Sequence, residues 1–393
     1  MPESIVIVSA ARTPMGAFQG DFSCFAAHDL GGAAIKAAVE RAGIKGDVVN
    51  EVLFGNCLMA GQGQAPARQA AFKGGLPISA GAVTLSKMCG SGMRAAMFAH
   101  DMLLAGSADV TVAGGMESMT NAPHLLPKGR SGIRIGHGQI FDHMMLDGLE
   151  DAYEAGRSMG TFGEDCAAKY NFTREAQDKF ATASVERAQV AIKTGAFLAE
   201  ITPVTVKGRA GDTIISIDEG PGKIKLDKIA GLRAAFKKDG TITAASSSSI
   251  NDGAAALVMM RQSTADKSGV KPMARIVSHA THAQEPNWFA TAPLGATQKA
   301  LAKAGWTAKD VQLWEINEAF AVVPMALMTE LSLSHEIVNV NGGACALGHP
   351  IGASGARIIV TLIHAMQARG LKRGLATLCI GGGEATAMAI ELI

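Results

Sequence analysis

The chain has 393 residues, a formal net charge of +1 at pH 7, 48% hydrophobic residues and 46 glycines. A nearly neutral charge argues against nucleic acid or an anionic membrane as a partner. At about 150 residues per domain the length predicts two or three domains, and the many small and apolar residues are typical of α/β enzymes.

Targeting signals are not evident in the sequence. We find no run of about 18 apolar residues and no signal peptide at the N-terminus, and the last three residues, Glu391-Leu392-Ile393, are not a peroxisomal signal. The protein is therefore expected to be cytoplasmic. None of the six cysteines forms a C-x-x-C pair, so the sequence predicts neither a disulfide framework nor a metal site.

The first 118 residues alternate between strand and helix patterns. Apolar stretches at 4–10 and 108–118 predict strands, and alanine-rich stretches at 29–42 and 66–74 predict helices. Such alternation favours βαβ units, so we expect a largely parallel sheet.

Cys89 lies at the centre of this first half. A short β-branched run from Val83 predicts a strand, and Met93 to Leu104 predicts a helix. Cys89 stands at the join, where Gly90 and Gly92 permit a tight turn. A thiol at a helix N-terminus is favoured as thiolate, so we expect a lowered pKa and a nucleophile. Taken alone, a free cysteine is more often a small buried hydrophobe.

Residues 119–249 have a different texture, with many Pro, Gly and basic residues. Only Thr173 to Lys193 predicts a long helix, with Thr173 as its N-cap. The segment is too long for a plain connection and predicts a separate excursion with functional loops. It ends at the tract 246–249, four serines that fit a polar loop and a ligand contact equally well.

The second half repeats the first. Asp310–Ile316 resembles the region from Asp47, and Ser354-Gly355-Ala356-Arg357 resembles Ser91-Gly92-Met93-Arg94, at one common separation. Residues 376–384 also resemble the strand around 111–117. A shared separation indicates an internal duplication, so two similar α/β halves should pack about a pseudo-twofold axis.

Three further residues could act together with Cys89. His349 lies in a rigid Gly-Pro loop and could accept a thiol proton, although it could also simply bond a backbone carbonyl. Cys379 ends a strand and precedes three glycines, whose N–H groups could hold an anion; alone it is more plausibly a core cysteine. Asn317 could hold a water, although alone it is more plausibly a helix cap.

Together these four loops resemble the thiolase family. Cys89-Gly-Ser-Gly, Asn317-Glu-Ala-Phe, Gly348-His349-Pro350 and Cys379-Ile-Gly381 match its active-site loops in order and spacing, over essentially the whole chain. The resemblance implies a duplicated α/β/α/β/α five-layer fold with an inserted loop domain. It also implies acyl transfer between coenzyme A thioesters, no metal or redox cofactor, and a homodimer or homotetramer.

On this resemblance we divide the chain into three parts. Residues 1–118 and 250–270 form the N-terminal half, residues 119–249 the inserted loop domain for CoA and oligomer contacts, and residues 271–393 the C-terminal half.

The resemblance also implies residue roles. Cys89 would carry the acyl group, and His349 would accept its proton. The N–H groups of Cys89 and Gly381 would bind the oxyanion. Cys379 would remove the α-proton of acetyl-CoA, and His349 with a water on Asn317 would hold the enolate. The implied reaction is the reversible condensation of two acetyl-CoA to acetoacetyl-CoA and CoA.

Expected contacts to the CoA thioester come from five positions: Ser248, Leu149, Phe236, Met159 and Phe320. The sequence departs from the short-chain family pattern at three places near the ligand. These are Ser158 in place of a histidine, Trp288-Phe289-Ala290 in place of Met-Gly, and Pro221 in place of a basic residue.

Alternative functions were weighed. Gly90, Gly92 and Ala95 followed by Asp109 fit a dinucleotide-binding fingerprint, which would indicate an NAD-dependent oxidoreductase; against it, Asp109 begins its predicted strand instead of ending it. A catalytically inactive CoA-binding protein finds no support. Within the thiolase reading, a broad-chain 3-ketoacyl-CoA thiolase of β-oxidation competes with the favoured short-chain enzyme.

Overall fold

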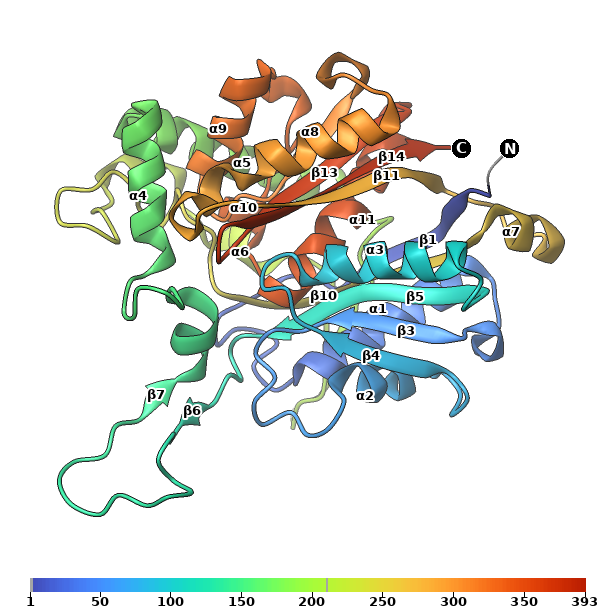
Figure 1. Cartoon of the computed structure of the whole chain (residues 1–393), viewed down its shortest axis with the longest axis horizontal. Coiled ribbons are helices and arrows are strands. Elements are labelled where there is room, and N and C mark those ends of the chain that lie inside the picture. The colour runs from blue at the N-terminus through green and yellow to red at the C-terminus, as the bar shows by residue number, and fades with distance from the viewer. Residues whose placement is uncertain (1–2, 210) are drawn as a thin grey trace.

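The structure is a computed structural model that describes residues 3–209 and 211–393. Ten strands form one mixed sheet path in the order β12-β13-β14-β11-β1-β10-β5-β3-β4, with β2 beside β10 (Figure 1). The strands of this sheet are β1 (Ile5–Arg12), β2 (Gly16–Ala17), β3 (Glu51–Gly55), β4 (Gly81–Leu85), β5 (Val110–Ser118), β10 (Asn251–Arg261), β11 (Ala274–Ala283), β12 (Leu313–Ile316), β13 (Arg373–Ile380) and β14 (Glu384–Leu392).

The path divides into two halves at its centre. β1 pairs with β10 along most of its length but with β11 only through Val6 and Ile7. On one side the order is β3-β5-β10-β1, and on the other it is β12-β13-β14-β11. The isolated bridge from Trp314 to Val338 takes the place that β4 has in the first half. This shared order agrees with the predicted duplication.

Helices cover both sheets and fill the space between them (Figure 1). The apolar faces of α3 (Ser91–Leu104) and α11 (Ile351–Arg369) pack between the two halves in one buried cluster. The outer layers are α1 (Ala27–Ala42) with α2 (Pro66–Lys73), and α8 (Ala292–Ala304) with α9 (Val322–Leu331). The predicted five-layer α/β/α/β/α fold is therefore confirmed.

The expectation of a largely parallel sheet is wrong. The parallel pairs in the described sheet are β3–β4, β3–β5 and β12–β13, and the others are antiparallel. Two connections without a crossover helix explain the difference. β13 and β14 are joined by the tight turn 381–383, and the long excursion after β5 lets β10 return beside it in the opposite direction.

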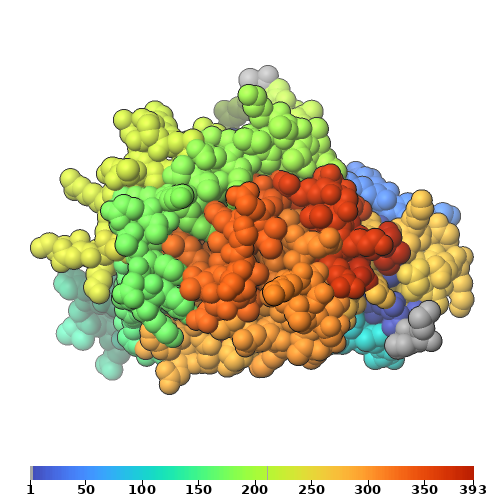
Figure 2. Space-filling view, turned by 90° about the horizontal axis from the view of Figure 1, so that it is seen from above, coloured from blue at the N-terminus to red at the C-terminus, as the bar shows by residue number. Residues whose placement is uncertain are grey.

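The excursion holds several elements of its own. They are β6 (His124–Leu125), β7 (Phe141–Asp142), a π-helical turn (Met145–Leu149), α4 (Met159–Tyr170), α5 (Arg174–Thr194), β8 (Val204–Val206), β9 (Thr213–Ile215), α6 (Glu219–Lys223) and a 3-10 turn (Leu226–Gly231). The Thr173 hydroxyl caps α5 by accepting from the N–H of Ala176, as predicted. Helix α4 was not predicted. Seen from above, these green to yellow residues flank the orange and red second half (Figure 2).

A buried ion pair network ties the excursion to β1. The Arg12 guanidinium donates to Glu200 at 2.5 Å and to Asp218 at 2.6 Å, and all three side chains are buried. Because a buried charge is stable only when paired, this network holds both acidic segments against the sheet. Where the excursion begins and ends as a domain remains a prediction.

The remaining helices and turns are short. They are α7 (Gln262–Ser268), α10 (Ala344–Leu347) and 3-10 turns at Gly46–Val48, Pro286–Thr291, Ala308–Asp310 and His335–Ile337. Contrary to the sequence expectation, α11 is long and apolar enough to cross a membrane, but 83% of that stretch is buried inside the fold. Its apolarity is explained by its position between two sheets.

Candidate active site

Cys89 lies on a sharp turn between β4 and α3. Met88, directly before it, has a φ of +45°, a left-handed conformation that is costly for a residue with a side chain. The Ser91 hydroxyl accepts from the N–H of Lys87 at 2.7 Å and donates to the Met88 carbonyl at 2.6 Å. The predicted strand–turn–helix join is therefore present, and its strain is held by local hydrogen bonds.

The pKa of Cys89 differs from the expectation. Burial raises the pKa of this thiol to about 11, although the backbone N–H groups of Gly381 and of Cys89 itself lower it in part. The predicted lowering is wrong because the sulfur packs against two apolar clusters, and desolvation outweighs the helix end. A thiol of this kind needs a base that removes its proton during attack.

His349 is the residue that the sequence predicts as this base. Its Nδ1 lies 2.5 Å from the Ser354 hydroxyl oxygen, which donates its own hydrogen to the Pro350 carbonyl at 2.9 Å. The hydroxyl can therefore only accept from Nδ1–H, which leaves a lone pair on Nε2. Nε2 is buried and has no partner in the described structure. Burial lowers the pKa of His349 to about 3, so the ring is neutral.

Cys379 is the penultimate residue of β13 and is fully buried. Burial and the neighbouring Cys89 raise its pKa well above the usual range. The following turn places Gly382 and Gly383 at φ of +91° and +84°, which only glycine adopts readily. This turn presents the N–H of Gly381 to the sulfur of Cys89. Cys89, Cys379 and Gly381 are thus brought together.

Asn317 follows β12, and its N–H donates to the Thr377 carbonyl of β13 at 3.0 Å. Both polar atoms of its side chain are buried and lack partners in the described residues. The next helix, α9, has Ala321 as its N-cap, so the helix-cap interpretation of Asn317 is wrong. A buried amide left unpaired is costly, and it fits a site that holds a water or a ligand.

The loop around His349 meets the same region. α11 begins two residues later, and its Ile351 shares an apolar cluster with Cys89. A methyl group on Gly92 would lie 2.7 Å from the Ala356 nitrogen, so α3 and α11 touch backbone to backbone near their N-termini. The N-terminus of α3, which follows the Cys89 turn, therefore lies next to the N-terminus of α11, which follows the His349 loop.

Aromatic side chains line the Cys379 side. Phe236 and Phe320 meet edge to face at 5.6 Å, and Phe320 meets Phe289 at 6.4 Å. Phe289 and Phe320 share a buried cluster with Cys379, and Phe236 and Met159 pack against it. The Met159 sulfur lies 3.3 Å from the position that a Cβ atom added to Gly381 would occupy.

Two other predicted contacts border the site. Leu149 closes the π-helical turn and packs in the Cys89 cluster. The serine tract runs beside the Asn317 loop, where the Ser248 N–H donates to Ala319 at 2.9 Å. The hydroxyls of Ser246, Ser247 and Ser249 bond within the protein. In residues 3–209 and 211–393 the Ser248 hydroxyl shows no such partner.

The departures from the family pattern have structural consequences. Ser158 caps α4 by accepting from the N–H of Gly160. Pro221 is buried in α6, so a ligand does not reach it. The Trp288 ring stacks under the Lys169 ammonium at 4.4 Å, and its neighbour Phe289 enters the aromatic cluster.

Sequence reasoning missed several supporting residues. Besides Ser354, Asn251 accepts from the His349 N–H at 3.2 Å. Glu117 accepts from Cys57, Leu58 and Gly352, which joins the loop after β3 to the start of α11. Burial raises the Glu117 pKa to about 7. The one signal for Glu117 in the sequence is that it stands as a charged residue near the end of a predicted buried strand.

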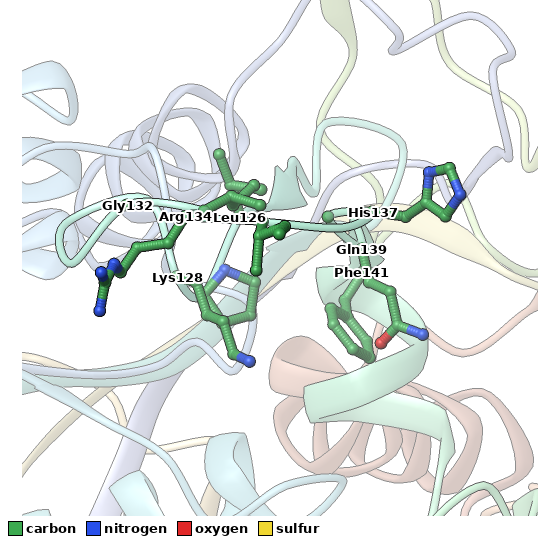
Figure 3. Close-up of a pocket in the computed structure, with 11 residues that line it drawn as sticks. Leu126, Lys128, Gly132, Arg134, His137, Gln139 and Phe141 are labelled. Carbon is green, nitrogen blue, oxygen red and sulfur yellow. The ribbon is translucent and has the colours of Figure 1, made fainter.

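A hollow under the loop of the β6–β7 hairpin lies elsewhere. It is lined by residues 126–141, including Lys128, Arg134 and Phe141, and by none of the candidate residues (Figure 3). The site described above does not depend on it.

Comparison with known proteins identifies the family. Residues 5–263 match the thiolase N-terminal domain, and residues 270–392 match the thiolase C-terminal domain. The chain belongs to the thiolase family. This thiolase is 50% identical over 389 residues to the acetyl-CoA acetyltransferase of Chromobacterium violaceum, covering 98% of this chain and 99% of that protein. It is also 50% identical over 391 residues to the acetyl-CoA acetyltransferase of Escherichia coli K12, covering 99% of each.

Solved structures agree with the architecture. The crystal structure of the Bacillus anthracis acetyl-CoA acetyltransferase matches this thiolase with a TM-score of 0.96 at 40% identity, over 100% of this chain and 99% of that one. The Acat5 thiolase from Ascaris suum in complex with coenzyme A matches with a TM-score of 0.93 at 40% identity, over 99% and 100%.

The dinucleotide interpretation does not survive the structure. Asp109 directly precedes β5 and forms an ion pair with Arg261, whereas a ribose-binding acid ends a strand. The NAD-dependent oxidoreductase reading is therefore wrong for this thiolase.

Proposed function

We propose that this thiolase is an acetyl-CoA acetyltransferase that condenses two acetyl-CoA to acetoacetyl-CoA and CoA, reversibly. The observation that carries this proposal is a sequence identity of 50%, over essentially the whole chain, to proteins of that name. Coenzyme A thioesters are its substrates, and the site supplies the groups that their chemistry needs.

The first half-reaction forms an acyl-enzyme. Cys89 attacks the thioester carbonyl as its proton passes to Nε2 of His349, and the N–H groups of Cys89 and Gly381 hold the oxyanion. The carbon–sulfur bond to CoA then breaks, and the departing sulfur takes the proton of Cys379. This leaves a Cys379 thiolate beside the acetylated Cys89.

The second half-reaction forms the carbon–carbon bond. The Cys379 thiolate removes an α-proton from a second acetyl-CoA, and His349 with a water on Asn317 stabilises the enolate oxygen. The enolate carbon attacks the acetyl group on Cys89. When Cys89 leaves, it regains the proton held by His349. Two thiols are required because a sulfur bound in a thioester cannot act as a base.

The proposed binding surface follows from the same residues. Met159, Phe236 and Phe320 offer apolar contacts beside Cys379, Leu149 lies beside Cys89, and the free hydroxyl of Ser248 faces the pantetheine arm. Phe289 adds bulk to the acyl end of the site, which supports a short acyl chain.

Thiolysis of 3-ketoacyl-CoA substrates of rising length tests this proposal. We expect the specificity constant to fall steeply beyond acetoacetyl-CoA, because Phe289 and Phe320 pack bulky rings in the same cluster as Cys379. A flat or rising profile would instead support a broad-chain 3-ketoacyl-CoA thiolase. Phe289→Met should widen the accepted range.

We further propose a homodimer or homotetramer in the cytoplasm. The β6–β7 hairpin projects from the body (Figure 1) and exposes Ile135 by 96% and Ile140 by 68%. Large exposed apolar residues on a projecting arm favour contact with another copy. The six free cysteines are compatible with a reducing compartment.

Light scattering of a double variant, Ile135→Ser with Ile140→Ser, tests the assembly. We expect a smaller assembly than that of the unaltered chain, because the apolar contact is lost. An unchanged mass would contradict the role of the hairpin, and it would leave the catalytic proposal unaffected.

A further inference from the structure

Three side chains that can ligate a metal converge where the C-terminal half of α3 meets β11. His100 and Asp101 lie on α3, and His279 lies on β11 of the second half. Nε2 of His279 is 3.1 Å from Nδ1 of His100 and 3.1 Å from Oδ1 of Asp101. Nδ1 of His100 is 3.0 Å from the same Oδ1. The three atoms thus form a nearly equilateral triangle.

Hydrogen bonding alone does not satisfy this triangle. The carboxylate carries no hydrogen, and each of the two ring nitrogens carries at most one. If both nitrogens carry a hydrogen, both can donate to Oδ1 of Asp101, and the edge between His100 and His279 has no hydrogen bond. If only one nitrogen carries a hydrogen, the edge between the other nitrogen and Asp101 has none. At most two of the three short contacts are therefore hydrogen bonds in any tautomer.

A cation resolves all three contacts at once. An ion bound at about 2.0–2.2 Å from each atom would sit slightly outside the triangle. Ligand atoms about 3 Å apart then subtend nearly right angles at the ion, as on one face of an octahedron. Two imidazoles and one carboxylate on one face, with the other positions open, form the set that suits Fe²⁺, Co²⁺, Ni²⁺ or Zn²⁺. Calcium and magnesium prefer oxygen ligands alone.

The surroundings fit an accessible but ordered site. The side chains of His100 and His279 are only 15% and 14% exposed, whereas Asp101 is 55% exposed and opens the site to solvent. The two rings are fixed at right angles, with centroids 4.7 Å apart. Lys303 carries a positive charge that would repel a bound cation, but its ammonium bonds the His279 carbonyl at 3.0 Å and so faces the backbone.

We propose that His100, Asp101 and His279 form a binding site for a divalent transition-metal ion. The sequence predicts no metal site because its ligands come from helix and strand segments in different halves of the chain, with no local spacing motif. In the described residues these are three donors whose ligating atoms all lie within 4.8 Å of one another. A bound ion would cross-link α3 to β11, and thus the central helix layer to the second sheet.

Calorimetric titration of the purified full-length chain with NiCl₂ tests the site. The protein is first treated with iodoacetamide so that accessible thiols such as Cys89 do not bind nickel. We expect saturable binding of about one ion per chain and a higher unfolding temperature in its presence. His279→Gln should weaken binding at least about tenfold, since even outer-sphere partners of metal ligands cost this much.

The matched control is His28→Gln. His28 and Asp29 are also a His-Asp pair on a helix, with Nδ1 and Oδ1 3.8 Å apart, but they lie outside the three-residue group. Binding should survive this change. Anomalous diffraction at the nickel edge, on crystals of the unaltered chain, should place the ion against His279. Non-saturable binding, binding unaltered by His279→Gln, or an anomalous peak elsewhere would overturn the proposal.

Discussion

The hydrogen bond between His349 and Ser354 decides which imidazole nitrogen can take a proton. Ser354 donates to the Pro350 carbonyl, so its oxygen accepts from Nδ1–H and leaves Nε2 as the basic atom. Ser354 is therefore a positioning residue that acts through His349.

Ser354→Ala should lower kcat by roughly 10–100-fold with a smaller change in KM, because the ring loses its fixed tautomer and orientation. The rate of Cys89 alkylation by iodoacetamide, measured against pH, should change shape as well. Ser354→Thr keeps the hydroxyl and should recover most of the loss. Equal losses in both variants would indicate packing alone.

Cys379→Ala should separate the two half-reactions. Attack by Cys89 uses His349 and the oxyanion N–H groups, and CoA can leave as a thiolate that takes its proton from solvent instead of from Cys379. Mass spectrometry should therefore still detect an acetylated chain. Condensation should fall by roughly 10²–10⁴-fold, the contribution of a positioned base. Normal acetoacetyl-CoA formation by this variant would remove Cys379 from the role given to it, and Cys89→Ala serves as the variant without any acyl-enzyme.

Individual site residues could be predicted from the sequence where the local composition is unusual. Glycine and proline flank Cys89, His349 and Cys379, and such rigid loops could be recognised without coordinates. Ser354 and Glu117 could not be recognised in this way, because their partners come from other segments and nothing beside them is unusual. The raised pKa of Cys89 was also missed, since burial is a property of the assembled core.

The contact between helices α3 and α11 positions the Cys89 turn relative to the His349 loop, because these two segments directly precede the helices. Both helices lie in the layer between the sheets, and their backbones approach each other closely at Gly92 and Gly355. A side chain there would meet backbone atoms, which cannot rotate away.

Gly92→Ala should therefore separate the two helices. We expect a loss of about 1–3 kcal/mol in the free energy of unfolding, the usual cost of overpacking, together with a large loss of activity. Urea unfolding measures the first and thiolysis the second. Gly222→Ala is the control, since a methyl group there would have no atom within 4 Å. Equal stability of the two variants would show that the helices adjust freely.

Element type was easier to predict than strand direction. The predicted helices at 29–42, 66–74 and 173–193 all exist within two residues at their ends, because caps and apolar spacing are local. Helix α4 was missed because its glycines and the surrounding loops conceal the pattern. Strand direction depends on whether a crossover helix intervenes, and residues 119–249 contain helices that do not serve as one.

For the whole molecule, histidines with a lowered pKa contribute to the loss of stability in acid. Burial lowers the pKa of His335 from 6.5 to about 4, and the ring stacks on Phe180 at 4.5 Å. Below pH 6.5 the unfolded chain gains a proton that the folded chain does not accept until about pH 4. The free energy of unfolding therefore falls as the pH drops through this interval.

His335→Phe should reduce that fall, by at most about 1.4 kcal/mol per pH unit, while retaining the stack on Phe180. Unfolding temperatures at several pH values between 7 and 4 provide the measurement. His137→Gln, at an exposed histidine of the β6–β7 hairpin, should keep the slope of the unaltered chain. If both variants show the same dependence of unfolding temperature on pH, groups other than His335 cause the loss of stability in acid.

The position of β1 has a consequence for how the chain is made. This strand is synthesised first, yet it lies in the middle of the sheet path between β10 and β11, whose partners for Ile5 and Val6 are Arg261 and Arg275. At roughly 5–20 residues per second, a ribosome needs from about a quarter of a minute to about a minute to reach them. For that time a largely apolar strand, fully buried in the finished fold, has no neighbouring strands, so newly made chains should depend on chaperones that shield nascent segments.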